Sequence, residues 1–88
     1  MPHKRTDSNQ AKIVKDLRKK GYWLWLTHMV GHGFPDIIVL DKKLRLNLFE
    51  IKTDVGKLNE LENKFWLTYR GRGATIRTAD EAIAYMED

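Results

Sequence analysis

The chain has 88 residues, no cysteine and a formal net charge of +4, with a sequence pI near 9.5. This length predicts one domain, 1–88, with a small core. The absence of cysteine excludes a disulfide framework and a thiolate metal site. No apolar run is long enough to cross a bilayer and nothing resembles a signal peptide, so we expect a cytoplasmic protein without a membrane partner. The basic charge fits a nucleic-acid partner.

The first expected element is an amphipathic helix over 7–20, which Gly21 closes. Asp7 and Gln10 have the spacing of a capping box at its start. Gln10 also lies one turn before the apolar stripe, which would turn its side chain inward. Both interpretations of Gln10 remain open here. The stripe itself is formed by Ile13, Val14 and Leu17.

A strand over 22–26 is expected next, because this segment is uncharged and rich in aromatic residues. Its alternation places Trp23 and Trp25 on one face, where they serve either the core or a subunit interface. The loop 27–34 follows, and its two glycines let the backbone approach a partner closely. We regard His32 in this loop as a candidate for phosphate or base contacts.

The centre of the chain reads as a β-hairpin. Two apolar runs, 37–40 and 46–51, flank a charged segment, which is typical of a hairpin whose sheet is covered on both faces. If the turn is centred on Lys43, the numbers of paired residues sum to 86. Asp36 then lies opposite Glu50.

This register gathers Asp36, Glu50 and Lys52 at one end of an otherwise apolar face. Directly opposed residues have Cβ atoms ~4.5–5.5 Å apart, so the two carboxylates repel unless a positive charge lies beside them. Mg²⁺ or Mn²⁺ would supply that charge, because hard carboxylates without a histidine pair suit these ions better than Zn²⁺. The alternative is a surface hairpin whose charges are simply solvated.

The remaining chain predicts a helix over 58–70, a basic turn, a strand over 74–77 and a last helix. Capping-box spacing opens both helices, in the pairs Asn59 with Glu62 and Thr78 with Glu81. Glu62 also falls on the inward side, so it either reaches the carboxylate pair or only caps its helix. The order α-β-β-β-α-β-α predicts an α/β fold in which helices flank a mixed sheet.

Pro-Asp followed after a hairpin by Glu-x-Lys resembles the signature of the PD-(D/E)xK nucleases. The fuller pattern is similar to the small VRR-NUC domains, which occur alone in phages and prophages. Two departures stand out: Ile76-Arg77-Thr78 replaces the Val-Arg-Arg that names the family, and Glu62 replaces a frequent glutamine. The matching segments are Gly33-Phe34-Pro35-Asp36, Glu50-Ile51-Lys52 and Gly56-Lys57-Leu58.

The resemblance implies a restriction-endonuclease-like core and a divalent-metal-dependent DNA endonuclease that selects branched DNA or Holliday junctions, acting as a homodimer in the host cytoplasm. It also implies that the Ile51 carbonyl joins Asp36 and Glu50 as a metal ligand, and that Lys52 assists the chemistry. It favours Glu62, and a polar residue of the first helix such as Gln10, as supporting groups near the metal.

The candidate contacts to DNA are basic residues in turns and loops. We expect recognition through the backbone and shape of the DNA, because so small a chain has little surface for reading sequence. Two other classes stay open: a non-catalytic DNA-binding module of the same fold, and a small structural subunit. The candidate contacts are His32, Arg45, Lys57, Arg70, Arg72 and Arg77.

Overall fold

The computed structural model describes residues 7–53 and 55–88, with side chains from position 9 onward. The predicted capping box of the first helix depends on the Asp7 side chain and so lies outside the described residues. The predicted order of elements is confirmed. The elements are α1 (Asp7–Lys19), β1 (Trp23–Leu26), β2 (Ile37–Leu40), β3 (Leu46–Ile51), α2 (Glu60–Thr68), β4 (Arg72–Ile76) and α3 (Ala79–Glu87).

The four strands form one mixed sheet in the order β1-β2-β3-β4. The first three strands are antiparallel neighbours, whereas β4 runs parallel to β3 after the α2 crossover. Ile38 pairs with Leu48, and Leu40 pairs with Leu46. The predicted hairpin register is therefore confirmed.

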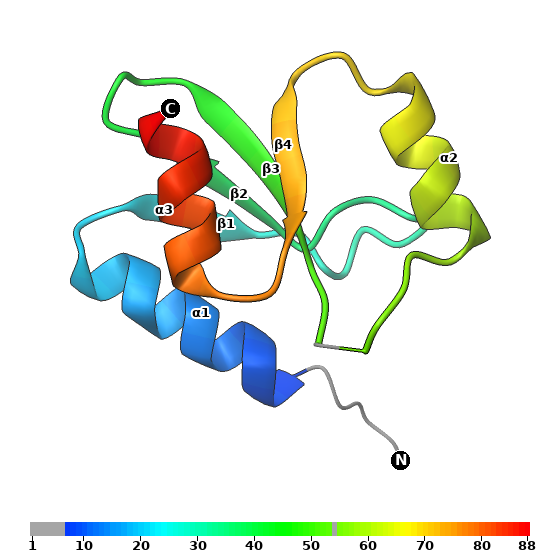
Figure 1. The fold of residues 1–88 in the computed structure, drawn as a ribbon, viewed down its shortest axis with the longest axis horizontal. Helices are drawn as coiled ribbons and strands as arrows, with labels where there is room; N and C mark the ends of the chain where they lie inside the picture. Colours follow the sequence, from blue (N-terminus) through cyan, green and yellow to red (C-terminus); the bar gives the residue numbers. More distant parts are fainter. Residues whose placement is uncertain (1–6, 54) are drawn as a thin grey trace.

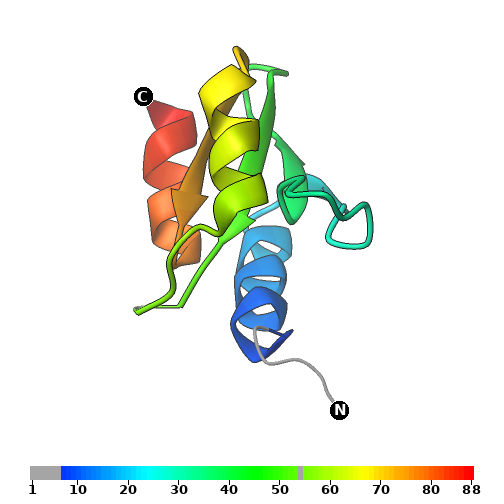
Figure 2. The ribbon, with the colours of Figure 1, turned by 90° about the vertical axis from the view of Figure 1, so that its right-hand side faces the viewer.

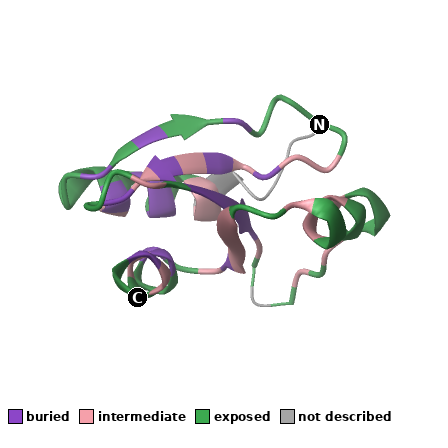
Figure 3. Ribbon diagram, turned by 90° about the horizontal axis from the view of Figure 1, so that it is seen from above, coloured by how far each residue is buried: buried purple, intermediate pink, exposed green. Residues whose placement is uncertain are grey.

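The helices divide between the two faces of the sheet. Helices α1 and α3 lie side by side against one face, and α2 stands apart from them (Figures 1 and 3). Viewed from the side of α2, strands β3 and β4 lie behind this helix (Figure 2). No helix in the described ranges is long and apolar enough to cross a membrane.

The core lies between the sheet and the α1–α3 layer. Gly21, at a φ of 88°, ends α1 and lets the Tyr22 N–H bond the Leu17 carbonyl at 3.1 Å. The chain thereby turns directly from the helix into β1. The main buried side chains are Ile13, Leu17, Leu24, Ile37, Val39, Phe49, Ile51, Ile76, Ala82 and Met86.

The opposite face of the sheet is covered only in part, which corrects the prediction that helices cover both faces. Helix α2 lies over β3 and β4, where Trp66 packs against Gly73. It does not reach β1, which is largely exposed (Figure 3). We call the uncovered part the open face; it consists of Trp23, Trp25, Ile38, Leu40 and Leu46.

The bounds of α2 and β4 differ from those predicted. Helix α2 begins after Asn59, which caps it, and ends before Tyr69, whose backbone is extended. It has no fully buried residue, and Leu61 is half exposed. Strand β4 begins within the predicted turn, because pairing with β3 overrides the low strand propensity of Gly73.

Candidate active site

The hairpin brings Asp36 and Glu50 together as the register predicted. Asp36 precedes β2, and its backbone N–H donates to the carbonyl of Phe49 at 2.9 Å. The Asp36 carboxylate in turn accepts a hydrogen bond of 2.8 Å from the Ile51 N–H. These two hydrogen bonds, to the backbone of Phe49 and from that of Ile51, fix Asp36 next to Glu50.

Lys52 and Glu62 complete the cluster. The Lys52 ammonium lies 3.5 Å from a Glu50 oxygen and 2.8 Å from Glu62 Oε1. Glu62 comes from the first turn of α2, where its carboxylate also accepts the Asn59 N–H at 2.9 Å. Capping and reaching the site were alternatives in the sequence, and the structure shows Glu62 doing both.

Gly33 allows the first turn of α2 to lie this close to the site. A Cβ added at Gly33 would come within 2.5 Å of the Leu61 backbone and 2.9 Å of the Glu62 nitrogen. Gly33 also has a φ of 84°, a conformation that glycine adopts without strain. Glycine is therefore favoured at this position both by the close approach of the α2 backbone and by the positive φ.

The cluster holds more carboxyl groups than cationic groups in a buried place. Asp36, Glu50 and Glu62 lie around Lys52, whose ammonium pairs with Glu50 and Glu62. Glu50 is only 3% exposed, and its Oε1 has no hydrogen-bond partner among the residues the structure describes. An unpaired buried carboxylate oxygen is costly, so this site lacks a positive or donating partner.

The pKa values follow from this arrangement. Burial, reinforced by the neighbouring Asp36 and Glu62 carboxylates, raises the pKa of Glu50 to about 9. Burial also raises the pKa of Asp36, although the Ile51 N–H opposes the shift. For Glu62 the effect of burial is outweighed by the Lys52 ammonium and the Asn59 N–H, which lower its pKa. Burial lowers the pKa of Lys52, but the Glu62 and Glu50 carboxylates raise it overall.

The residues present fit a hard divalent cation bound by few protein ligands. No group of three His, Cys, Asp or Glu side chains within 9–53 and 55–88 is arranged to hold a metal. The available donors are two carboxylates, Asp36 and Glu50, and the Ile51 carbonyl. In an extended strand the N–H and C=O of one residue point to the same edge, and the Ile51 N–H points at Asp36. Mg²⁺ commonly accepts such a set and completes it with water and phosphate.

Asn9, rather than the predicted Gln10, connects α1 to this region. The Asn9 amide donates to the Lys52 carbonyl at 3.1 Å. The Gln10 amide lies 3.2 Å from His28 Nδ1 and forms no hydrogen bond with Asp36, Glu50 or Lys52 in the described structure. The sequence held a signal for Asn9, since it lies four residues before the buried Ile13.

Four of the candidate DNA contacts lie in loops or at their ends. His32 and Lys57 are exposed, the first with a φ of 57°. Arg70 is exposed just after α2. Arg77 donates to the carbonyls of Thr53 and Gly56, each at 3.0 Å, and so ties down the loop that leads to α2.

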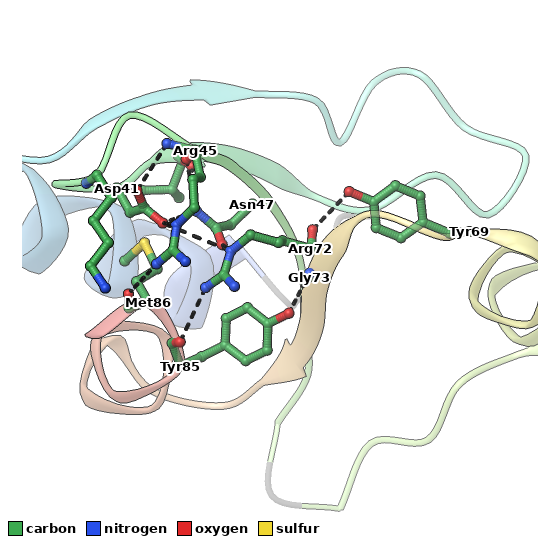
Figure 4. Close-up of polar contacts among 10 residues, drawn as sticks. Asp41, Arg45, Asn47, Tyr69, Arg72, Gly73, Tyr85 and Met86 are labelled. Atoms are coloured by element: carbon green, nitrogen blue, oxygen red, sulfur yellow. Dashed lines mark hydrogen bonds and ion pairs between the residues drawn. The ribbon is translucent and has the colours of Figure 1, made fainter. Parts of the chain in front are cut away.

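The other two candidate contacts, Arg45 and Arg72, are occupied inside the protein at the far end of the hairpin (Figure 4). Arg45 donates to Asp41 at 2.9 Å and to the Met86 carbonyl at 3.0 Å. Arg72 donates to Asn47 at 2.8 Å. These contacts join the hairpin turn to α3, so we assign both arginines a structural role.

Asp41 is the centre of that network. Burial raises the pKa of Asp41, but hydrogen bonds from Arg45, Asn47 and the Lys43 N–H outweigh burial and hold the pKa at about 2. Nothing in the sequence distinguished Asp41 from a solvated turn residue. Its donors come from the turn and β3, and Arg72 of β4 adds a longer ion pair of 3.8 Å to Asp41 Oδ2.

Comparisons with known proteins found no matching family model, no matching curated protein and no matching solved structure. The resemblance to VRR-NUC domains therefore rests on the motif residues alone. The fold that is established is a small α/β domain with a four-stranded mixed sheet and three helices among the described residues.

Proposed function

We propose that the chain is a divalent-metal-dependent endonuclease that hydrolyses phosphodiester bonds in branched DNA. The observation that carries this proposal is the pairing of Asp36 with Glu50 beside Lys52, with one buried Glu50 oxygen unpartnered. A dedicated cation site explains why two carboxylates are kept close together in a buried place. Solvated surface charges do not explain it, because Glu50 is almost fully buried.

Asp36, Glu50 and the Ile51 carbonyl would hold Mg²⁺ or Mn²⁺. When bound, such an ion acidifies a water molecule and neutralises the scissile phosphate. Lys52, on the same face, positions the attacking water or stabilises the charge that develops on the phosphate. Glu62 orients Lys52 through their 2.8 Å ion pair. Water adds to phosphorus, and the bond to the leaving oxygen breaks to give a phosphate monoester and a hydroxyl end.

The DNA would lie over the loops that border this cluster. Exposed groups there include Lys57, with His32 in the loop before Asp36, and the exposed Arg70 lies further away, after the opposite end of α2. These groups suit contacts to the DNA backbone. The resemblance to VRR-NUC domains supports branched substrates, a homodimer that presents two sites to a symmetric junction, and action in the cytoplasm of the host cell.

The test is a cleavage assay on matched linear, flapped and four-way-junction DNA with Mg²⁺ or Mn²⁺. We expect cutting that EDTA abolishes and that prefers the branched substrates. Lys52→Ala should reduce the rate by about 10²–10³-fold, the usual loss for a group that stabilises developing charge. Lys12→Ala is the matched control, because Lys12 is exposed and paired with Asp16 on α1.

Two results would overturn the proposal. If no substrate is cut while DNA still binds, the chain is a non-catalytic DNA-binding module. If it neither cuts nor binds DNA, the structural-subunit interpretation takes its place. Sedimentation velocity with and without a four-way junction tests the proposed homodimer separately.

A further inference from the structure

Two tryptophans lie exposed on the same sheet face as the candidate active site. Trp23 is 51% exposed and Trp25 is 63% exposed. Their rings are nearly parallel, with centroids 6.1 Å apart and an interplanar angle of 16°. Such large aromatic groups normally bury most of their surface, so two on an uncovered face indicate a contact surface.

The sheet register places this aromatic pair beside the carboxylates. Trp25 pairs with Ile38 on β2, and Ile38 pairs with Leu48 on β3. The next row on the same face contains Asp36 and Glu50. Two residues along a strand span about 7 Å. A ligand that contacts the site and extends along the strands would therefore reach Trp25 and then Trp23.

The charges of the chain favour a polyanion over a second copy as the occupant of this face. The exposed Lys43 lies in the hairpin turn at one end of the face, whereas the Lys52 ammonium at the other end is paired with Glu62 and Glu50. The net charge of +4 attracts a polyanion, and a copy of this chain seated on this face would cover the surface next to Asp36. A nucleic-acid strand carries the opposite charge and offers flat bases that stack on indole rings.

We propose that the open face is a base-stacking platform for single-stranded DNA that leads from the active site. This inference rests on the proposed nuclease function and specifies its substrate: a branched DNA with an unpaired segment next to the scissile phosphate. The bases of that segment stack on Trp25 and Trp23, while the phosphates lie near Lys52 and Lys43. A fully paired duplex cannot make these contacts, because its bases are already stacked on one another.

Binding measurements in EDTA test the platform without requiring cleavage. The probes are an oligothymidylate of about 12 nucleotides, within the range a single-strand-binding module covers, and an abasic oligonucleotide of the same length. We expect the thymidylate to quench tryptophan fluorescence and to bind more tightly than the abasic strand. Trp25→Ala should weaken thymidylate binding by about 5- to 150-fold per lost stacking contact and leave abasic binding unchanged.

Trp25→Phe is the matched variant, and it should retain most of the affinity because its ring still stacks. The wild-type comparison of the two oligonucleotides needs no variant, so misfolding cannot mask the result. Equal binding of the two strands by the wild-type protein would overturn the platform. So would equal weakening of both by Trp25→Ala, or a Trp25→Ala protein that loses only self-association.

The same preparations separate this inference from the nuclease proposal. Stacking in EDTA without cutting after Mn²⁺ is added would refute the nuclease function and leave the platform in place. Cutting of branched DNA at the wild-type rate by Trp25→Ala, without any preference for bases, would refute the platform and leave the nuclease function in place.

Discussion

Glu50 has a carboxylate that is almost fully buried, lies next to two others and has one ammonium nearby. Its raised pKa means that the metal-free folded protein holds a proton that the unfolded chain releases. The folded state then binds more protons than the unfolded state between the two pKa values, so raising the pH destabilises it. Binding of a divalent cation must displace this proton, so metal affinity rises with pH.

We predict that the metal-free protein loses stability as the pH rises from about 4.5 to about 9, the ordinary and the folded pKa of Glu50. Mn²⁺ should raise the Tm, and more so at the upper end of this range, by mass action. Thermal unfolding in EDTA and in Mn²⁺ at several pH values measures both effects. Glu50→Gln should lose both, whereas Glu60→Gln, on the exposed side of α2, should keep them. An undiminished Mn²⁺ effect in Glu50→Gln would exclude Glu50 as a ligand.

Among the elements, α2 is the one whose placement decides the shape of the site. It has no fully buried residue, and its contacts include the Lys52–Glu62 ion pair, the packing of Phe34 against Phe65 and that of Trp66 against Gly73. Gly33 lets the preceding loop lie against the first turn of the helix. A substitution at Gly33 should therefore displace Glu62 and, through the ion pair, alter the position of Lys52.

We predict that Gly33→Ala lowers cleavage activity and destabilises the fold by more than the strain of about 1–3 kcal/mol at positive φ, because its Cβ would also meet the Leu61 backbone. Gly31→Ala is a matched control with a similar φ of 78° and nothing within 4 Å of the added Cβ. Both substitutions place a side chain at a positive φ, which strains the backbone, but only Gly33→Ala also introduces a steric clash. Denaturant unfolding and cleavage rates of the two proteins measure the difference. Equal effects would mean that the approach of α2 does not matter.

The features that the sequence predicted are those with a local cause. The alternation of apolar residues and the position of the turn were enough to place Asp36 opposite Glu50, because a strand has a period of two residues. The open face remains uncovered because of where α2 docks on the sheet. No local sequence pattern predicts that docking position. The structural role of Arg72 likewise arises from contacts with Asn47, 25 positions away.

For the molecule as a whole, the net charge of +4 is distributed so that several basic groups are already used within the protein. Arg45 and Arg72 bind protein acceptors, and Lys12 is paired with Asp16. The number of basic side chains free to contact phosphates is therefore smaller than the composition indicates. Each contact between one of the remaining basic side chains and a phosphate should make the DNA affinity fall more steeply with salt concentration.

We predict that the affinity for DNA in EDTA falls steeply with salt, with a slope set by the phosphate contacts that Lys57 and Arg70 supply. Lys57→Ala should reduce the magnitude of the slope of log K against log[salt] by about one. Lys12→Ala should leave it unchanged. Titrations at several salt concentrations give these slopes, and a slope near zero for the wild-type protein would contradict electrostatic binding.

The two ends of the central hairpin differ in how well their polar groups are satisfied. At the turn, Asp41 has donors for both carboxylate oxygens, whereas at the open end Glu50 has an oxygen without one. Within the hairpin, the unsatisfied group thus lies at the end where the chemistry is proposed, and the hydrogen bonds of the turn hold the other end of the strands together. Stability and activity are therefore partly separable in this molecule. Substitutions that reinforce the turn can offset the cost of keeping a strained pair of carboxylates at the other end.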